Sequence, residues 1–282
     1  MRFVTFEQGG YRRGGVVLND RIVSLEDAGF PNLLSVLQGG TEALTKVGAF
    51  IAATAATIPI ESVKLCAPIP VPPKILCMGL NYRDHAKEAK LEIPTCPVIF
   101  AKYSNTVIGS GDSVVLPKNS RKPDYEAEFG FVIGKSARHV SAEDWREYVF
   151  GYLNCNDVSA RDLQTAVSQW TMGKNFDTFA PMGPFLVSAD EIEDPHNLSI
   201  SLTLNGAIMQ NSNTRELIFK IPETVEFLSS VMTLEPGDVI LTGTPAGVGF
   251  SHRPPIWLKP GDEMVVRIEG LGELRNTCVA EI

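Results

Sequence analysis

Two glutamates separated by one alanine stand in the segment DYEAEFGFVIG, residues 124–134. Side chains alternate between the two faces of a β-strand, so Glu126 and Glu128 project from one face while an unbroken apolar row occupies the other. Two anions about 6–7 Å apart repel each other unless a cation lies between them. A half-buried strand with a polar solvent face fits the same pattern, but Gly130 and Gly134 favour the close approach of a ligand or another backbone.

A third carboxylate follows in GYLNCNDVSARDLQ, where Asp157 stands at the end of an apolar, strand-like run. The ends of strands are common positions for site residues. Three carboxylates, with the remaining positions filled by water and substrate oxygens, suit a hard cation. Zinc is less suited because no cluster of Cys or His accompanies them. The sequence therefore predicts a site for Mg²⁺ or Mn²⁺ at Glu126, Glu128 and Asp157.

A candidate general base lies in GLNYRDHAKEAKLEIP. We expect a short helix from Asn81 to Leu91, capped by Asn81, which places His85 and Glu88 at i and i+3 on one face. A carboxylate beside a histidine fixes the ring tautomer and raises its basicity, as a base acting on water or an acidic C–H group requires. A solvated, charge-rich helix face is the alternative interpretation.

Three further segments carry groups that could face an anionic substrate. Lys174 lies in the apolar and aromatic segment QWTMGKNFDTFAPMGPF, and lysine is seldom buried without a partner. Arg161 and Gln164 could fork onto a substrate carboxylate or stand exposed on a turn. The loop GTPAGVG, residues 243–249, matches neither a dinucleotide-binding loop nor a P-loop, so we expect its backbone and the Thr244 hydroxyl to face a ligand carboxylate.

The elements that must position these residues divide the chain into two parts. Residues 1–66 contain short β-like runs and a helix-like segment, residues 41–56. The stretch APIPVPPK, residues 67–74, has four prolines and predicts a stiff connector. Residues 75–282 contain many short apolar runs. Helices are expected there at residues 142–148, after Ser141 as N-cap, and at residues 222–232. The pattern predicts an α+β, mostly β fold.

Composition excludes several classes of protein. The net charge of -8 disfavours a general nucleic-acid binder, and no stretch approaches the ~20 apolar residues of a membrane span. The N-terminus lacks the pattern of a signal or transit peptide, so we expect a cytoplasmic protein with neither nucleic acid nor membrane as a partner. Five cysteines are odd in number and far apart, which predicts reduced core thiols, Cys155 among them.

Taken together and in this order, the motifs resemble the fumarylacetoacetate hydrolase superfamily. They are KILCMGLNYRDHAKE, DYEAEFGFVIGK, NDVSARDLQ, QWTMGKNFDTFAPMGP, LNGAIMQNSNT and PGDVILTGTPAGVG. The resemblance covers about Lys74 to the C-terminus, and the segment before it is compatible with the small variable domain of that family. SARDLQ, QWTMGKNFDTF and HRPPIWLKPGD are most similar to the fumarylacetoacetate hydrolase domain-containing protein 2 branch.

The resemblance implies a fumarylacetoacetate hydrolase-like mixed β-roll or barrel in the C-terminal domain, after a small N-terminal α+β domain, and often a homodimer. It also implies the metal at Glu126, Glu128 and Asp157 and a dyad on a lid segment. The remaining roles implied are catalytic for His85, Glu88 and Lys174, and substrate-binding for Arg161, Gln164 and Thr244.

These implications lead to a hypothesis of function. We expect hydrolysis of a C–C bond in a 2-oxo acid with a second carbonyl, of the acylpyruvate or fumarylpyruvate type, through a metal-bound enolate. His85 would activate water, and Lys174 would stabilise negative charge. Oxaloacetate tautomerisation or decarboxylation, or isomerisation of unsaturated oxo-diacids, are alternatives on the same site. A non-catalytic fold with a structural ion is a further alternative, which the dyad and Lys174 disfavour.

Overall fold

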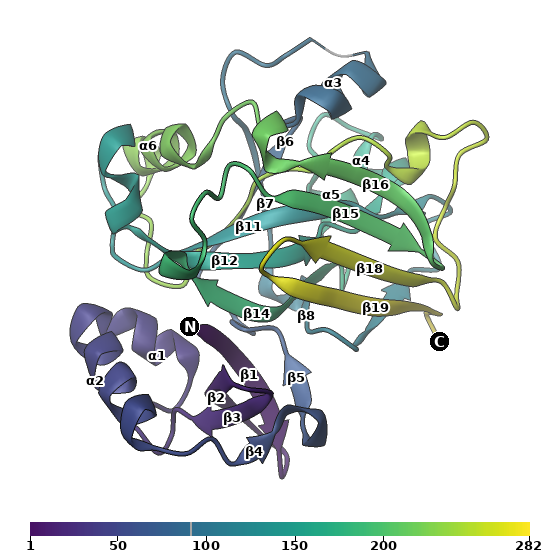
Figure 1. The fold of residues 1–282 in the computed structure, drawn as a ribbon. Coiled ribbons are helices and arrows are strands. Elements are labelled where there is room, and N and C mark those ends of the chain that lie inside the picture. The colour runs from purple at the N-terminus through teal and green to yellow at the C-terminus, as the bar shows by residue number, and fades with distance from the viewer. Residues whose placement is uncertain (91) are drawn as a thin grey trace.

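Two packed β-sheets form the body of the protein (Figure 1). The computed structural model describes residues 1–90 and 92–282. Within these residues the larger sheet has twelve strands, ordered β4-β3-β2-β1-β14-β12-β11-β17-β6-β7, with β5 paired to β1 and β8 to β14. The smaller sheet has five strands, ordered β16-β15-β18-β19-β9, and a short pair, β10-β13, stands apart. The expected α+β, mostly β fold is confirmed, with open sheets in the described chain.

The strands of the N-terminal part and of the first half of the larger region are short. Their bounds are β1 Arg2–Gln8, β2 Tyr11–Leu18, β3 Arg21–Ser24, β4 Ile58–Pro59, β5 Lys64–Cys66, β6 Ile75–Gly79, β7 Val98–Lys102, β8 Val107–Ile108, β9 Ser113–Leu116 and β10 Pro123–Asp124. The later strands are β11 Ala127–Ile133, β12 Val149–Asn156, β13 Ser159–Ala160, β14 Ala180–Ser188, β15 Ser199–Leu204, β16 Ala207–Asn213, β17 Val239–Leu241, β18 Glu263–Ile268 and β19 Gly272–Ala280.

Few helices accompany the sheets. They are α1 Leu33–Gln38, α2 Gly40–Ala53, α3 Arg83–Ala89, α4 Arg161–Gln164, α5 Thr171–Lys174 and α6 Ile221–Val231. The helices expected at residues 41–56 and 222–232 therefore form within a few residues of the predicted bounds. Ser141 does act as a cap, but the segment it caps, Ala142–Glu147, is a 3-10 helix. No helix among the described residues is long and apolar enough to cross a membrane.

The main core lies where the smaller sheet packs across β11, β12 and β14. The face of β11 that carries Ala127, Phe129, Phe131 and Ile133 joins this core, as the alternation predicts. The opposite face of β11 is buried too, because Val132 packs in a second core with residues from the N-terminal strands. A strand buried on both faces has no solvent face for its glutamates, so the two carboxylates require buried partners.

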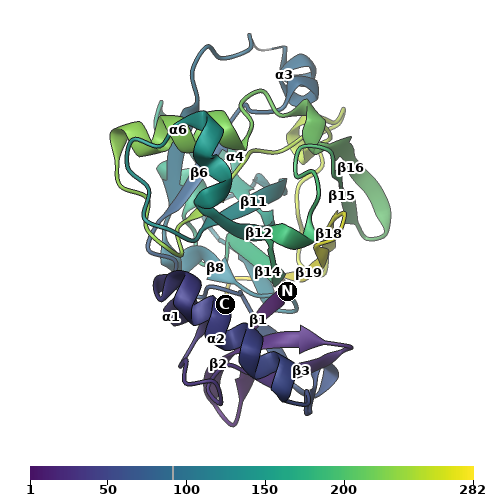
Figure 2. The same ribbon diagram turned by 60° about the vertical axis from the view of Figure 1, so that its left-hand side comes forward.

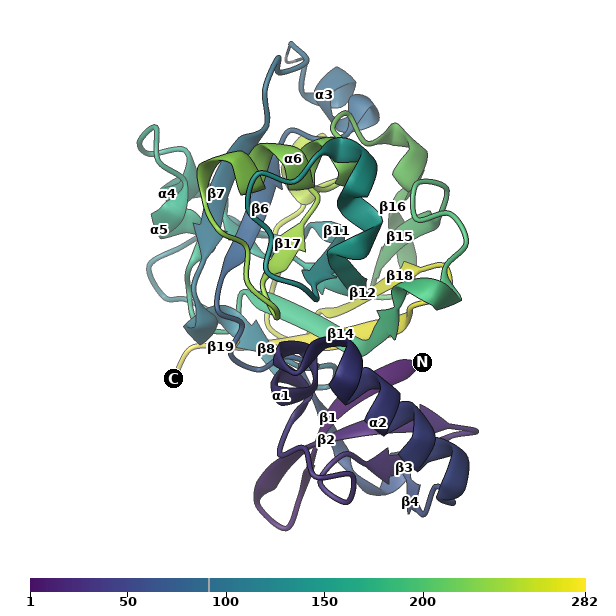
Figure 3. The same ribbon diagram turned by 90° about the vertical axis from the view of Figure 1, so that its left-hand side faces the viewer.

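The N-terminal strands continue the larger sheet. β1 pairs with β14 through Arg2–Val187 and Phe3–Leu186, and α1 packs beside the larger region while α2 lies across the N-terminal strands (Figure 2). Residues 67–74 contain neither helix nor strand, in keeping with a stiff connector. Figures 2 and 3 show this N-terminal part at one end of the molecule and α3 at the opposite end. The division into residues 1–66, 67–74 and 75–282 stays a prediction.

The structure corrects one local expectation and decides between the two alternatives of another. Asn81 does not cap α3, because Tyr82 occupies the cap position and the Asn81 amide instead donates to the carbonyls of Phe219 and Thr242. The predicted last residue, Leu91, lies outside the described residues. Gly130 makes room for a neighbouring strand, the second of its two expected roles, because a Cβ there would lie 2.8 Å from the Leu153 side chain.

Candidate active site

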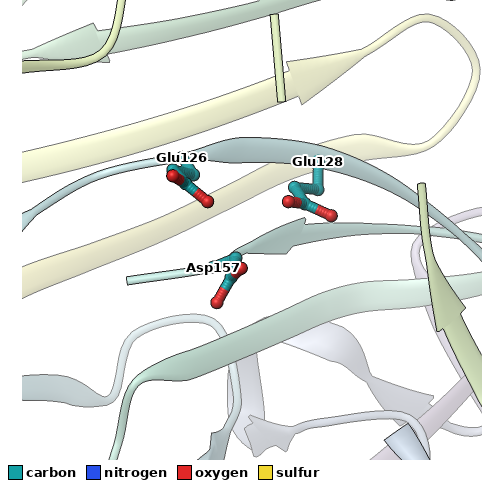
Figure 4. Close-up of side chains that lie close together, drawn as sticks. All are labelled: Glu126, Glu128 and Asp157. Atoms are coloured by element: carbon teal, nitrogen blue, oxygen red, sulfur yellow. The ribbon is translucent and has the colours of Figure 1, made fainter. Parts of the chain in front are cut away.

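The three predicted metal ligands lie side by side. Glu126 directly precedes β11, Glu128 lies on it, and Asp157 directly follows β12, whose Asn156 pairs with Ala127. One carboxylate oxygen from each residue lies within 4.8 Å of those from the other two, and all three side chains are buried (Figure 4). The antiparallel pairing of two neighbouring strands therefore brings together carboxylates that are far apart in the sequence.

Two lysines hold Asp157 from opposite sides. The Lys174 ammonium, at the end of α5, lies 2.5 Å from Asp157 Oδ2 and 2.7 Å from Glu126 Oε2. Lys102, at the end of β7, donates to Asp157 Oδ1 at 2.6 Å and to the Val158 carbonyl at 3.2 Å. Burial opposes the charge of Lys174, but the Asp157 and Glu126 carboxylates outweigh it and hold the pKa of Lys174 above its usual range.

Arg161 is held mainly by protein carboxylates. Its Nε donates to Asp124 at 2.8 Å, and its Nη1 lies 2.6 Å from Glu126 and donates to Gln164 Oε1 at 2.9 Å. The expected fork of Arg161 and Gln164 onto a ligand is thus corrected in part, because the two side chains bond each other. Arg161 Nη2 is buried without a hydrogen-bond partner in the described chain, which leaves one donor for a ligand. Burial opposes ionisation of Glu126, but Arg161 and Lys174 outweigh it and lower its pKa.

Glu128 differs from its neighbours because no lysine or arginine in the described residues forms an ion pair with it. Its Oε2 accepts a hydrogen bond from the Gly243 amide at 2.9 Å. Burial, followed by the charges of Asp157 and Glu126, raises the pKa of Glu128 well above its usual value. A divalent cation would offset this repulsion, and an all-oxygen donor set suits Mg²⁺ or Mn²⁺. The residues present therefore fit the expected ion.

The dyad lies on α3 and bonds to the loop after β17. His85 Nδ1 and Glu88 Oε2 are 3.4 Å apart, and the Gly247 amide donates to both Glu88 oxygens at 3.1 and 3.2 Å. Burial opposes the charge of Glu88, but the contacts with His85 and with the Gly247 amide outweigh it and lower the pKa of Glu88. An ionised Glu88 suits the orientation of the imidazole.

The loop at residues 243–249 binds protein carboxylates. Its amides at Gly243 and Gly247 donate to Glu128 and Glu88, which corrects the expectation that they face a substrate carboxylate. The Thr244 hydroxyl lines the cavity and accepts from Gln210 Nε2 at 2.8 Å.

One cavity of about 390 Å³ joins these groups. His85, Glu126, Glu128, Arg161, Gln164, Lys174 and Thr244 line it together with Lys122 and an apolar wall that includes Met78, Phe100, Trp170, Phe250 and Trp257. The predicted residues thus line one cavity, apart from Glu88 and Asp157. These two contact the lining residues His85 and Lys174. Sequence reasoning missed Lys102, Lys122, Asp124 and the aromatic wall. A lysine closing the apolar run VIFAK was the available signal for Lys102.

None of the five cysteines lines the cavity. Cys155 is free and buried, as predicted, and burial raises the pKa of its thiol. Cys96 is exposed, which corrects the expectation that every cysteine lies in the core.

A sequence model described as "Fumarylacetoacetate (FAA) hydrolase C-terminal" matches residues 74–279. The chain belongs to this family. It is 45% identical over 248 residues to "Oxaloacetate tautomerase Fahd2a, mitochondrial" of Rattus norvegicus, covering 88% of this chain and 79% of that one. It is 52% identical over 230 residues to "Fumarylacetoacetate hydrolase domain-containing protein 2 homolog" of Dictyostelium discoideum, covering 78% and 75%. The expected branch is confirmed.

A solved relative has a similar fold. The crystal structure of maleylpyruvate hydrolase from Sphingobium sp. SYK-6, in complex with manganese (II) ion and pyruvate, has a TM-score of 0.84 and 32% identity, with 100% of both chains covered. The rat relative is named as a mitochondrial protein. The cytoplasmic placement of this family member stays a prediction.

Proposed function

We propose that this family member is a divalent-metal-dependent enzyme that interconverts the keto and enol forms of oxaloacetate. The observation that carries the proposal is the shared cavity, in which the His85 imidazole faces the same space as Glu126 and Glu128. The likeness to a rat protein named oxaloacetate tautomerase, at 45% identity, supports this reaction ahead of the others that such a site permits.

The carboxylates would hold Mg²⁺ or Mn²⁺, which supplies Lewis acidity toward the carboxylate and 2-oxo oxygens of the acid. The contact of His85 Nδ1 with Glu88 leaves Nε2 as the ring nitrogen available to the substrate. In the keto-to-enol direction, Nε2 removes a proton from the carbon between the two carbonyl groups. The electron pair forms the new C=C bond, and the His85 imidazolium returns the proton to the 2-oxo oxygen, which regenerates the neutral base. Glu88 stabilises the imidazolium, and Lys174 offsets charge beside the reacting oxygens.

Hydrolysis of acylpyruvate or fumarylpyruvate substrates is the second candidate. A cavity of about 390 Å³ has room for more than a four-carbon acid, and the maleylpyruvate hydrolase likeness supports this candidate. Here His85 would deprotonate water, which attacks the distal carbonyl and breaks the C–C bond. Decarboxylation of oxaloacetate and isomerisation of oxo-diacids would use the same cavity. The candidates differ in product: only tautomerisation consumes oxaloacetate enol without releasing pyruvate, CO₂ or a second acid.

The test compares the wild-type protein with His85→Gln, each loaded with Mg²⁺ or Mn²⁺. Loss of oxaloacetate enol absorbance, pyruvate formation and cleavage of acylpyruvates are followed in parallel. We expect rapid enol loss without matching pyruvate, and a decrease of about 10²–10⁴-fold in the variant, the usual contribution of a general base.

The matched control is His139→Asn, because His139 is exposed, lies outside the cavity and has a positive φ of 53° that Asn tolerates. It should retain wild-type rates. Pyruvate formed in step with enol loss would replace the proposal with decarboxylation, and rapid acylpyruvate cleavage with unchanged enol decay would replace it with hydrolysis. Full activity in His85→Gln would remove His85 as the base.

A further inference from the structure

The cavity contains one cation that the site described above leaves unused. Lys122 lines the cavity, and its side chain is exposed. Lys102, Lys174 and Arg161 each pair with one or more buried carboxylates. In the described chain, the Lys122 ammonium pairs with none. It is therefore free to bind an anion that enters the cavity.

The backbone of Lys122 is fixed next to Arg161. Its carbonyl accepts a hydrogen bond from the Arg161 amide at 2.9 Å, and its amide donates to Ser120 Oγ at 3.3 Å. The following residue begins β10, where Pro123 pairs with Ala160. Arg161 is only 8% exposed, and its Nη2 has no partner in the described residues. Lys122 and Arg161 thus lie next to each other on hydrogen-bonded backbone segments. Both have donor groups that remain available to a ligand in the cavity.

The formal charges of the buried cluster show what a further cation in the cavity would do. The buried cluster contains four carboxylates and three cations: Asp124, Glu126, Glu128, Asp157, Lys102, Lys174 and Arg161. Its formal charge is one negative, and a divalent cation would make it one positive. That charge balances a single substrate carboxylate. A second carboxylate would remain uncompensated inside a partly desolvated cavity unless another cation contacted it.

We propose that Lys122 binds the second carboxylate of dicarboxylic 2-oxo acids and makes the site prefer diacids to monoacids. The inference rests on the proposed function in one respect, that a 2-oxo acid binds at the carboxylate triad. Lys122 takes no part in making or breaking bonds. It is a specificity-determining residue, whose long side chain contacts the distal end of the ligand.

The test uses two ligands that differ only at the far end. 2-Oxoglutarate ends in a carboxylate, whereas 2-oxopentanoate ends in a methyl group. Calorimetric titration of Mn²⁺-loaded protein gives the Kd of each, and Mn²⁺ affinity is measured separately by electron paramagnetic resonance. We expect Lys122→Met to raise the Kd of 2-oxoglutarate about fivefold to thirtyfold. This range lies between the contribution of an exposed ion pair and that of a buried charge-assisted hydrogen bond. The Kd of 2-oxopentanoate and the Mn²⁺ affinity should change less than about twofold, within the effect of a weak exposed pair.

The matched control is Lys118→Met, because Lys118 is exposed on the same segment and does not line the cavity. It should alter neither Kd. Added salt should reduce the diacid preference of the wild type and leave that of Lys122→Met unchanged. Equal effects of Lys122→Met on both ligands, or none on either, would overturn the inference. Loss of diacid preference in Lys122→Met, with a wild type that fails to interconvert oxaloacetate, would refute the proposed function alone.

Discussion

At the scale of single residues, Asp157 shows how the site tolerates so much buried negative charge. Each of its oxygens accepts from a different lysine, Oδ1 from Lys102 and Oδ2 from Lys174. The two ammonium groups thereby compensate the charge of the carboxylate and fix its position. In the described chain, Lys102 forms no ion pair with a residue that lines the cavity, so its role is to position the Asp157 carboxylate and to balance its charge.

Replacement of Lys102 should make the protein depend on the divalent cation. Lys102→Met leaves part of the charge of a fully buried carboxylate uncompensated, which should destabilise the metal-free protein by about 3–5 kcal/mol. A cation bound to the triad would compensate that charge, so the increase in Tm on addition of Mn²⁺ should be larger in the variant than in the wild type. Differential scanning calorimetry at matched Mn²⁺ concentrations measures both quantities.

Lys135→Met is the control for this comparison. Lys135 forms an exposed pair with Glu147 at 3.2 Å, and such pairs contribute about 1 kcal/mol or less. Its Tm and its response to Mn²⁺ should match the wild type. If Mn²⁺ raised the Tm of Lys102→Met no more than that of the wild type, Lys102 would not act through the carboxylate site.

Local spacing by itself predicts two pairs of residues in the site. Glu126 and Glu128 share a strand face, and His85 and Glu88 share a helix face, so short periodicity places each pair. The partners of these residues depend on which strands become neighbours. The bonds from Lys102 to Asp157 and from Arg161 to Asp124 span 55 and 37 residues, and no local pattern announces such pairings.

At the scale of elements, two glycines show how tightly β11 and β12 pack, and they predict different costs. A Cβ on Gly151 would lie 2.1 Å from the Val187 carbonyl oxygen, whereas one on Gly130 would meet the flexible end of Leu153 at 2.8 Å. A strand backbone cannot move away from the new methyl group as easily as the end of a leucine side chain can. Gly151→Ala should therefore destabilise the protein by about 3 kcal/mol or more, and Gly130→Ala by about 1 kcal/mol.

Urea unfolding of the two variants beside the wild type measures this difference. The pair serves as its own control, because the substitution and the burial are the same and only the neighbouring atom differs. Equal losses in the free energy of unfolding would contradict the prediction. They would show that the backbone beside Gly151 adjusts as easily as the Leu153 side chain beside Gly130. The sequence left open whether a ligand or another backbone approaches Gly130, because the partner strands that fill the space come from distant parts of the sequence.

At the scale of the whole molecule, the N-terminal part and the larger region share a core. Phe3, Val16 and Leu33 pack in the same cluster as Val132 and Leu186. The Phe3 ring lies 5.2 Å from the Phe150 ring across the β1–β14 pairing. A proline-rich connector indicates a boundary in the sequence, but it does not indicate whether the parts on either side bury surface against each other. The sheet that joins them arises from the pairing of β1 with β14, two strands that lie far apart in the sequence.

This shared core predicts one cooperative unfolding transition. All three tryptophans, Trp145, Trp170 and Trp257, lie in the larger region, so their fluorescence reports on that region alone. Phe3→Ala removes a fully buried ring and should cost about 3–5 kcal/mol. Because both parts unfold together, the tryptophan midpoint in urea should fall with the far-ultraviolet circular dichroism midpoint. Tyr11→Ala, at a residue 72% exposed, should shift neither. A tryptophan midpoint that stayed at the wild-type value while the dichroism signal split into two steps would show that the N-terminal part unfolds independently.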